Sequence, residues 1–221
     1  MSISVKICGI NSADAADAVL RAGADYGGLV FFAKSPRALT TEAGAALAAR
    51  MRGRLKLAAL VVDADDELLA RIAAEVKPDY FQLHGQESVA RAAAIRARFN
   101  IPLIKVFSVA EPGDLAKTAA YDDVAEMFLF DTPPADGATR PGGHGIAFDW
   151  RMLKAQRINR PWFLAGGLNP GNVARAIDVS GAGMVDVSSG VESAPGVKSP
   201  DLIAQFVAAA RTPAPKIEMR A

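Results

Sequence analysis

The sequence is poor in the residues that mark several classes of protein. It contains one cysteine, Cys8, so an intramolecular disulfide and a multi-cysteine metal site are both excluded. Its two histidines, His84 and His144, lie far apart in the sequence, and no cluster of acidic residues accompanies them. This pattern argues against a zinc site, and we expect no metal.

Charge of one sign and long apolar runs are also missing. The chain has 25 Lys and Arg against 24 Asp and Glu, a formal net charge of +1, which lacks the basic excess of a nucleic-acid binder. No uncharged apolar run approaches the roughly 20 residues of a membrane span. Lys6, Asp14 and Asp17 interrupt the apolar stretch that a signal peptide needs. We expect a cytoplasmic protein with no membrane or nucleic-acid partner.

The composition itself is that of a folded domain. The 221 residues are 51% apolar and 22% charged, so general disorder is excluded. We expect one domain over residues 1–211. The last ten residues, TPAPKIEMRA, contain two prolines and no apolar period, and we expect residues 212–221 to form a loosely held terminus.

Short β-rich runs alternate with Ala-rich helical stretches along the chain. The expected strands are Ile3–Cys8, Tyr26–Phe31, Lys56–Val62, Tyr80–His84, Leu103–Phe107, Met127–Asp131, Trp162–Ala165 and Met184–Ser188. The expected helices are Ser12–Ala22, Thr41–Met51, Asp65–Val76, Glu87–Phe99, Gly113–Tyr121, Asp149–Gln156, Pro170–Val179 and Pro200–Ala210. Asn11–Ser12 and Thr40–Thr41 supply capping side chains, and Pro170 suits a first helical turn.

Eight strand–helix units of this size predict an α/β fold, a single (β/α)8 TIM barrel. A doubly wound open sheet is the alternative, but it usually has fewer strands, and no GxGxxG follows the first strand. Residues 132–146, TPPADGATRPGGHGI, are too long for an ordinary strand-to-helix connection, and loops of this kind are often functional.

Polar side chains stand at the carboxyl ends of four expected strands, where the active site of such a barrel forms. Cys8 ends the first strand and Asp131 the sixth. Cys8 could be a buried small hydrophobe or, with a lowered pKa, a base or nucleophile. Asp131 could order a loop or form an acid–base pair with the thiol. The alternation of each strand also directs Gln82, His84, Asp186 and Ser188 toward this mouth.

Two glycine-containing segments predict a phosphate site. Gly166 and Gly167 follow the seventh expected strand, and Ser188, Ser189 and Gly190 end the eighth. Barrels frequently bind phosphate with these two loops and a short extra helix, for which we expect Val191–Ala194. The alternative is that the glycines only form tight turns.

Three further side chains remain open in role. Arg37, in Lys34-Ser35-Pro36-Arg37, could clamp a carboxylate or be a solvated surface residue. His84 could be a satisfied polar group or a proton shuttle. His144 lies in the glycine-rich loop, where exposure is the simpler interpretation.

Together these residues resemble the phosphoribosylanthranilate isomerase family. The matching motifs are Val5-Lys6-Ile7-Cys8-Gly9-Ile10, Gly28-Leu29-Val30-Phe31-Phe32 with Ser35-Pro36-Arg37, Gln82-Leu83-His84-Gly85, Phe130-Asp131, Phe148-Asp149-Trp150, Leu164-Ala165-Gly166-Gly167-Leu168 with Pro170 and Asn172-Val173, and Val185-Asp186-Val187-Ser188-Ser189-Gly190-Val191-Glu192. They occur in the family order over residues 5–192.

The resemblance implies a (β/α)8 barrel without cofactor or metal that catalyses an Amadori rearrangement in L-tryptophan biosynthesis. It implies that Cys8 is the general base and Asp131 the general acid, and that Arg37 holds the anthranilate carboxylate. It also implies substrate binding by the other mouth residues, with the phosphate on the loops and a sugar hydroxyl on Asp186: Gln82, His84, Gly166, Gly167, Asp186, Ser188, Ser189 and Gly190.

Two departures and two rivals accompany the resemblance. His144 stands where the family usually carries a small hydroxyl residue, and Ser199-Pro200 where an acidic residue is usual, which we expect to affect only the start of the last helix. The rivals are the analogous phosphosugar isomerase of histidine biosynthesis, which uses two aspartates, and a non-catalytic phosphosugar-binding barrel. Family members resemble both monomers and homodimers, so both states stay open.

Overall fold

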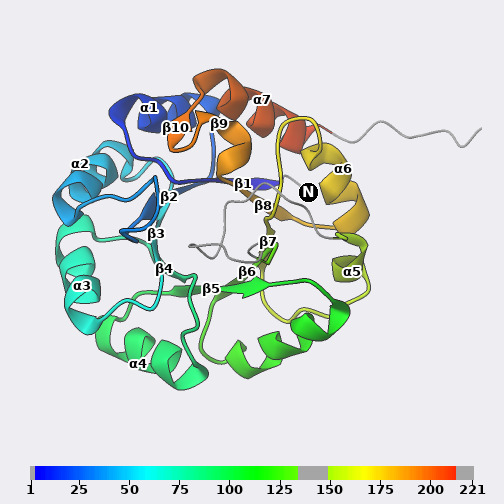
Figure 1. Ribbon diagram of the computed structural model, residues 1–221, viewed down its shortest axis with the longest axis horizontal. Coiled ribbons are helices and arrows are strands. Elements are labelled where there is room, and N and C mark those ends of the chain that lie inside the picture. Colours follow the sequence, from blue (N-terminus) through cyan, green and yellow to red (C-terminus); the bar gives the residue numbers. More distant parts are fainter. Residues whose placement is uncertain (1–2, 134–148, 213–221) are drawn as a thin grey trace, which may run out of the picture.

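Eight parallel strands close into a barrel, and helices surround it (Figure 1). The computed structural model describes residues 3–133 and 149–212. The strands are β1 (Ser4–Cys8), β2 (Tyr26–Val30), β3 (Lys56–Val61), β4 (Tyr80–Leu83), β5 (Leu103–Ser108), β6 (Met127–Asp131), β7 (Trp162–Leu164) and β8 (Met184–Val187). Each lies within a residue of its expected bounds, and β8 pairs with β1 to close the barrel, so the (β/α)8 prediction is confirmed.

The helices are α1 (Ala13–Ala22), α2 (Thr41–Met51), α3 (Asp66–Arg71), α4 (Val89–Phe99), α5 (Arg151–Lys154), α6 (Val173–Ser180) and α7 (Pro200–Arg211). A π-helix (Ile72–Val76) follows α3, and 3₁₀ helices span Pro112–Tyr121 and Ser189–Val191. The predicted caps are present, because the Ser12 and Thr40 side chains accept hydrogen bonds from the amides of Ala15 and Ala43. Within the described part of the chain, no helix has the length and apolar run that crossing a membrane requires.

Four helix predictions were wrong in detail. The helix expected over Asp65–Val76 changes from α to π geometry at Ile72, and the one expected over Gly113–Tyr121 is a 3₁₀ helix. In the latter, the Thr118 hydroxyl donates to the Leu115 carbonyl, three residues back, in place of a regular α-helical pattern. The helix expected over Asp149–Gln156 is the four-residue α5.

The fourth difference concerns Pro170, which is not in the first turn of α6. The helix begins after Asn172, and two asparagine side chains form the turn that precedes it. Asn169 Oδ1 accepts from the Gly171 amide at 2.8 Å, and Asn172 Oδ1 accepts from the Asn169 amide at 2.8 Å. These local bonds replace the first helical turn. The expectation for the tail falls, apart from Thr212, outside the described residues.

The interior of the barrel holds an apolar cluster and a polar end. The apolar cluster consists of seven buried residues: Ala58, Ile104, Val106, Met127, Leu129, Phe163 and Ala165. Toward the strand ends the inward side chains include Lys6, Gln82 and Asp186, all buried. In barrels of this kind, ligands reach such polar groups from the carboxyl ends of the strands.

Carboxylates that immediately precede alternate strands stabilise the opposite end of the barrel. Each accepts a backbone N–H at the start of the preceding strand. Asp25 accepts from Val5 of β1 at 2.8 Å, Asp79 from Leu57 of β3 at 2.8 Å, and Glu126 from Leu103, the first residue of β5, at 2.6 Å. Each also has a basic partner, respectively Arg211, Lys56 and Arg96. The repeat connects neighbouring strands in pairs.

Replacing Asp79 by alanine is expected to lower the free energy of unfolding by about 1–2 kcal/mol, because the Leu57 amide loses a charged acceptor. Chemical denaturation with and without the substitution measures this difference. Alanine at the exposed Asp123 is the control, and it should change stability little. Equal losses at the two positions would show that the repeated bond contributes nothing specific.

Candidate active site

Cys8 and its nearest charged neighbours lie inside the polar end of the barrel. Cys8 is the last residue of β1, and Lys6 points to the same interior two residues earlier. The Lys6 ammonium donates to Asp186 Oδ1, from the neighbouring strand β8, at 2.8 Å, and this ion pair is buried. Cys8 itself is 4% exposed. The thiol therefore stands beside a buried pair of opposite charges.

A second group of polar side chains comes from β4 and β6. Asp131 ends β6, and its Oδ1 accepts from the Thr132 amide at 2.8 Å. Its Oδ2 lies 3.6 Å from Nε2 of His84, which directly follows β4. Gln82 Nε2 lies 3.5 Å from Nδ1 of the same ring. Donation from Gln82 to Nδ1 places the ring proton on Nε2, which then faces the Asp131 carboxyl.

Burial changes the protonation of both members of the His84–Asp131 pair. Burial raises the pKa of Asp131 to about 7, so its carboxyl group retains a proton well above its ordinary range. Burial, with the ammonium groups of Lys6 and Lys105, lowers the pKa of His84 to about 3. Near pH 7 the imidazole is therefore neutral, and Asp131 can hold a proton for transfer.

The Cys8 thiol has its pKa raised, principally by burial. Lys6, Lys198 and Arg37 act in the opposite direction, and Asp186 adds to the increase. The lowered thiol pKa that would favour a base is therefore not found, and the role of Cys8 as base stays a prediction.

The two predicted phosphate loops contact one another. A side chain at Gly190 would collide with the Leu168 carbonyl oxygen, so the loop after β8 passes directly over the loop after β7. Gly166 and Gly167 have φ values of +82° and +65°, which glycine adopts readily. Ser188 Oγ donates to the Cys8 carbonyl at 3.2 Å and so connects this region to the thiol-bearing strand.

The short helix expected at Val191–Ala194 was wrong. A 3₁₀ turn occupies Ser189–Val191, and Glu192–Ala194 form a strand, β9, that pairs with β10 (Val197–Lys198) in a hairpin. The hairpin belongs to the connection between β8 and α7. Its geometry follows from Gly196, whose φ of +81° suits a tight turn.

Arg37 is neither a solvated surface residue nor an isolated cation. It is 5% exposed, and its Nε and Nη2 donate to the two Glu192 carboxylate oxygens at 2.6 and 2.8 Å. Lys198 donates to the same carboxylate at 2.7 Å and to the Ser188 carbonyl at 2.9 Å. Although burial alone would raise it, the pKa of Glu192 is lowered to about 2 by Arg37 and Lys198.

Sequence reasoning assigned no role to Glu192 or Lys198. Ser199-Pro200 was expected to affect only the start of the last helix, and Ser199 does cap α7 by accepting from the Leu202 amide. Lys198, however, is buried and joins the phosphate loop to the Arg37–Glu192 pair. The sequence signal that could have identified Lys198 was a charged residue between two apolar segments. Its burial, however, depends on the β9–β10 hairpin, which the sequence did not indicate. His144 lies outside the described residues.

Metal-binding geometry is absent from the part of the chain that the structure describes. No group of three or more His, Cys, Asp or Glu residues there could hold a metal ion. Two buried polar atoms at the mouth, Gln82 Oε1 and His84 Nε2, have no hydrogen-bond partner among the described residues. Unsatisfied buried polar atoms of this kind suit contact with a polar ligand.

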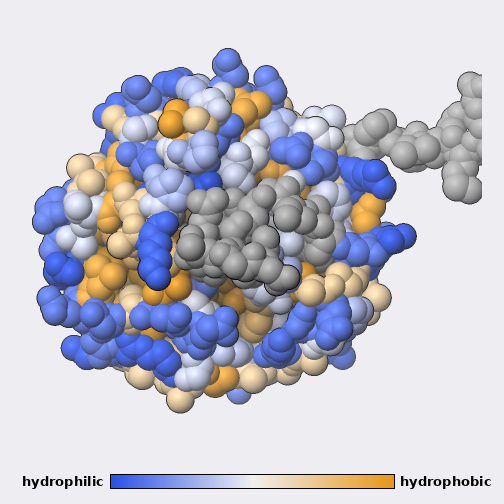
Figure 2. Space-filling view, in the orientation of Figure 1, coloured by the Kyte–Doolittle hydropathy of each residue, from blue (hydrophilic) through white to orange (hydrophobic). Residues whose placement is uncertain are grey.

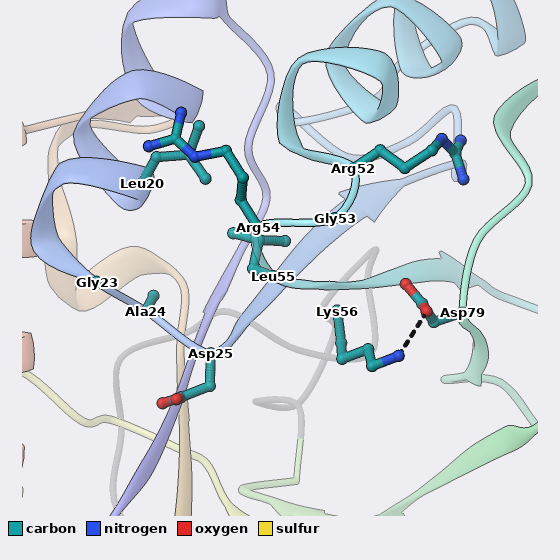
Figure 3. Close-up of a pocket in the computed structure, with 10 residues that line it drawn as sticks. All are labelled: Leu20, Gly23, Ala24, Asp25, Arg52, Gly53, Arg54, Leu55, Lys56 and Asp79. Atoms are coloured by element: carbon teal, nitrogen blue, oxygen red, sulfur yellow. Dashed lines mark hydrogen bonds and ion pairs between the residues drawn. The ribbon is translucent and has the colours of Figure 1, made fainter.

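Two clefts differ in what surrounds them. One, of about 430 Å³, lies beside the strand ends and is lined by His84, Lys105 and Tyr121 among others. A larger one, of about 720 Å³, lies by the strand starts, where Lys56 pairs with Asp79 and Asp25 projects from the start of β2 (Figure 3). Its carboxylates already accept strand amides, so its charges serve the fold. On the face of the molecule that Figure 2 shows, hydrophilic residues occupy most of the outer edge.

The fold and the site define the class of protein: a (β/α)8 barrel enzyme with a thiol, a protonated carboxyl group and glycine loops at the carboxyl end of its strands. Comparison with known proteins gives the family. Residues 5–209 match the family described as N-(5'phosphoribosyl)anthranilate (PRA) isomerase. The chain belongs to this family and is an isomerase of the aldose–ketose type.

The relatives cover nearly the whole chain. An N-(5'-phosphoribosyl)anthranilate isomerase of Rhodopseudomonas palustris (strain BisA53) is 50% identical over 211 residues, with 96% of this chain and 97% of that protein covered. One of Paramagnetospirillum magneticum is 47% identical over 211 residues, with 96% and 98% covered. The crystal structure of the Thermotoga maritima isomerase has a TM-score of 0.85 at 34% identity, covering 94% of this chain and 98% of that one.

Proposed function

We propose that this chain converts N-(5-phosphoribosyl)anthranilate into 1-(2-carboxyphenylamino)-1-deoxyribulose 5-phosphate, with Cys8 as general base and Asp131 as general acid. The observation that carries the assignment is that Cys8 and Asp131 end β1 and β6, at the same end of the closed barrel. Burial there raises the pKa of Asp131 to about 7, so its carboxyl group can hold a transferable proton. A solved structure of the family holds the reduced form of this product, at a TM-score of 0.80 and 32% identity.

The proposed steps need only proton transfers. Asp131 gives its proton to the furanose ring oxygen, and the C1′–O bond breaks to leave a Schiff base. The His84 Nε2–H, 3.6 Å away, stabilises the carboxylate that forms. The Cys8 thiolate then takes the proton from C2′, and the resulting enolamine tautomerises to the ketone. The rearrangement is internally balanced, so it requires neither cofactor nor metal.

The remaining mouth residues bind the two ends of the substrate. Backbone amides of the loops at Gly166–Gly167 and Ser188–Gly190 hold the phosphate, since glycine allows close approach to an anion. Arg37 holds the anthranilate carboxylate. Asp186 accepts a sugar hydroxyl, the unpartnered Gln82 Oε1 faces the substrate, and His84 borders the substrate beside Asp131. The enzyme acts in the cytoplasm, as a monomer or a homodimer.

The dependence of kcat/KM on pH tests the acid–base assignment. Activity requires a protonated Asp131, whose fraction falls as pH rises through about 7. It also requires the Cys8 thiolate, whose pKa lies above its ordinary value, so the thiolate fraction grows with pH. Because the pKa of the base lies above that of the acid, the product of the two fractions should rise up to about pH 7, change little up to the pKa of Cys8 and fall above it. Loss of substrate fluorescence, followed in the presence of EDTA, gives the rates, and a steady decline from about pH 6 upward would contradict the proposal.

The phosphate loops provide a separate prediction. Replacing Gly190 by alanine should raise KM and weaken inhibition by inorganic phosphate at least about tenfold, because the new methyl group would collide with the Leu168 carbonyl and separate the loops. Gly183 is the matched control, since a side chain there meets nothing within 4 Å. Unchanged phosphate inhibition in the Gly190 variant would remove these loops from the binding site.

A further inference from the structure

Lys6 is an unusual residue to find inside a barrel. Its side chain is fully buried, and its ammonium group donates to Asp186 at 2.8 Å. Burying an ammonium and a carboxylate is unfavourable unless both are well paired, and a pair of apolar side chains would usually fill such a space as well. The proposed reaction steps assign the ammonium no part. Its position therefore calls for a function other than packing.

The ammonium group lies against the thiol of Cys8. Opposite charge attracts the ammonium group to the thiolate form of the sulfur. Gly28, directly opposite Cys8 in β2, leaves the space in which they meet. A Cβ atom at Gly28 would lie 2.8 Å from Cys8 Sγ and 3.1 Å from Lys6 Nζ, so any larger residue would displace one of them. The barrel thus brings this one cation to this one sulfur.

The charges around the sulfur leave a place for one more negative charge. Four ionisable groups act electrostatically on Cys8: Lys6 on β1, Asp186 on β8, Lys198 on β10 and Arg37 in the loop after β2. Glu192 bonds both Arg37 and Lys198. With Cys8 as a thiol the cluster therefore has three cations and two anions, and with Cys8 as a thiolate it is neutral.

We propose that Lys6 is a positioning residue that, anchored by Asp186, stabilises the minor thiolate form of Cys8 that abstracts the substrate proton, in the space that Gly28 leaves open. This inference rests on the proposed role of Cys8 as base. In the step itself the C2′–H bond breaks, its electron pair forms the C1′–C2′ double bond of the enolamine, the π pair of the C1′–N bond moves to the nitrogen, and the proton forms S–H. Lys6 keeps its own proton throughout and remains paired with Asp186.

The titration of the thiol provides the test, because Cys8 is the only cysteine of the sequence. The ultraviolet absorbance of the thiolate is followed against pH, with the Cys8→Ala spectrum subtracted. Lys6→Met should raise the pKa of Cys8 by about one unit or more, a tenfold or greater loss of thiolate at a given pH. Asp186→Asn should lower the pKa, since that carboxylate opposes the thiolate. If Lys6 and Asp186 had only structural roles, the two substitutions would not shift the pKa of Cys8 in opposite directions.

Lys105→Met is the matched control. Lys105 is also a buried lysine of the barrel, paired with Glu87 at 2.8 Å, but it is not among the four groups that act electrostatically on Cys8. Its removal should disturb folding to an extent similar to that of Lys6→Met and leave the pKa of Cys8 unchanged. An unchanged thiol pKa in Lys6→Met, or the same rise in Lys105→Met, would overturn the proposal.

A second comparison applies where Lys6→Met alone does not fold. The double variant Lys6→Met/Asp186→Asn removes both buried charges together and leaves neither unpaired. Its thiol pKa should exceed that of Asp186→Asn alone, and equal values in the two would overturn the proposal. These titrations need no substrate. Turnover retained by Cys8→Ala would therefore refute the proposed base role of Cys8. The titration of Lys6→Met would still measure, independently, how Lys6 affects the pKa of the thiol.

Discussion

Replacing Cys8 by alanine is expected to lower kcat about 10²- to 10⁴-fold, the range that a general base contributes. No other thiol in the sequence can take over the proton from C2′, and Lys6 beside it is an ammonium without a free electron pair. Binding of the reduced product should change little, because the sulfur contacts the reacting carbon and not the charged ends of the ligand. Steady-state turnover and calorimetric binding measure the two effects separately.

Serine at position 8 controls for the cavity that alanine leaves. Cys8 packs with Val30 and Leu60, and serine preserves nearly the same volume. The serine hydroxyl loses its proton far less readily than a thiol, so little of the anionic base would form. Cys8→Ser should therefore be as inactive as Cys8→Ala. If the serine variant keeps near-complete activity, the sulfur serves packing and the assignment of the base is wrong.

Replacing Asp131 by asparagine should reduce kcat/KM by about 10³-fold or more, because the amide cannot supply a proton to the ring oxygen. The substitution keeps the shape of the side chain and an oxygen that can accept from the Thr132 amide. The residual rate should keep rising with pH above about 7 instead of levelling there, since the group that titrates there is gone. Asparagine at the exposed Asp178 of α6 is the control and should leave the rate unchanged.

The same variant should be more stable than the wild type above neutral pH. The pKa of Asp131 rises on folding from its ordinary value to about 7, so the carboxyl group favours the folded state most at low pH. That contribution is lost as pH rises through about 7, where a buried carboxylate forms. Thermal unfolding at about pH 8 compares the two proteins, and a less stable Asp131→Asn variant would indicate that the carboxylate is structurally required.

Strand alternation was the strongest source of prediction from sequence. It correctly directed Lys6, Cys8, Gln82 and Asp186 into the barrel, because side chains of a strand alternate between two faces and one face of each strand must pack on helices. The succession of eight strand–helix units then predicted that the sheet closes into a barrel. Each of these features follows from local periodicity, which does not depend on distant contacts.

Features that depend on distant partners could not be predicted in this way. The Arg37–Glu192 pair joins residues far apart in the sequence, and neither local segment indicates the other. The hairpin that buries Lys198 replaced a helix that local composition favoured. The π-helical end of α3 likewise meets α2 and depends on that packing. In each case tertiary contacts outweighed the local preference.

The solitary cysteine also determines how this molecule responds to oxidation. Peroxide converts a thiolate to a sulfenic acid, which many proteins rescue by forming a disulfide with a second thiol. This sequence has no second thiol, so an oxidised Cys8 depends on a small-molecule reductant before further oxidation makes the loss irreversible. Burial and a raised pKa slow the first step, since they keep most of the sulfur protonated and out of reach of solvent. The environment that tunes the base is therefore also its protection against oxidants.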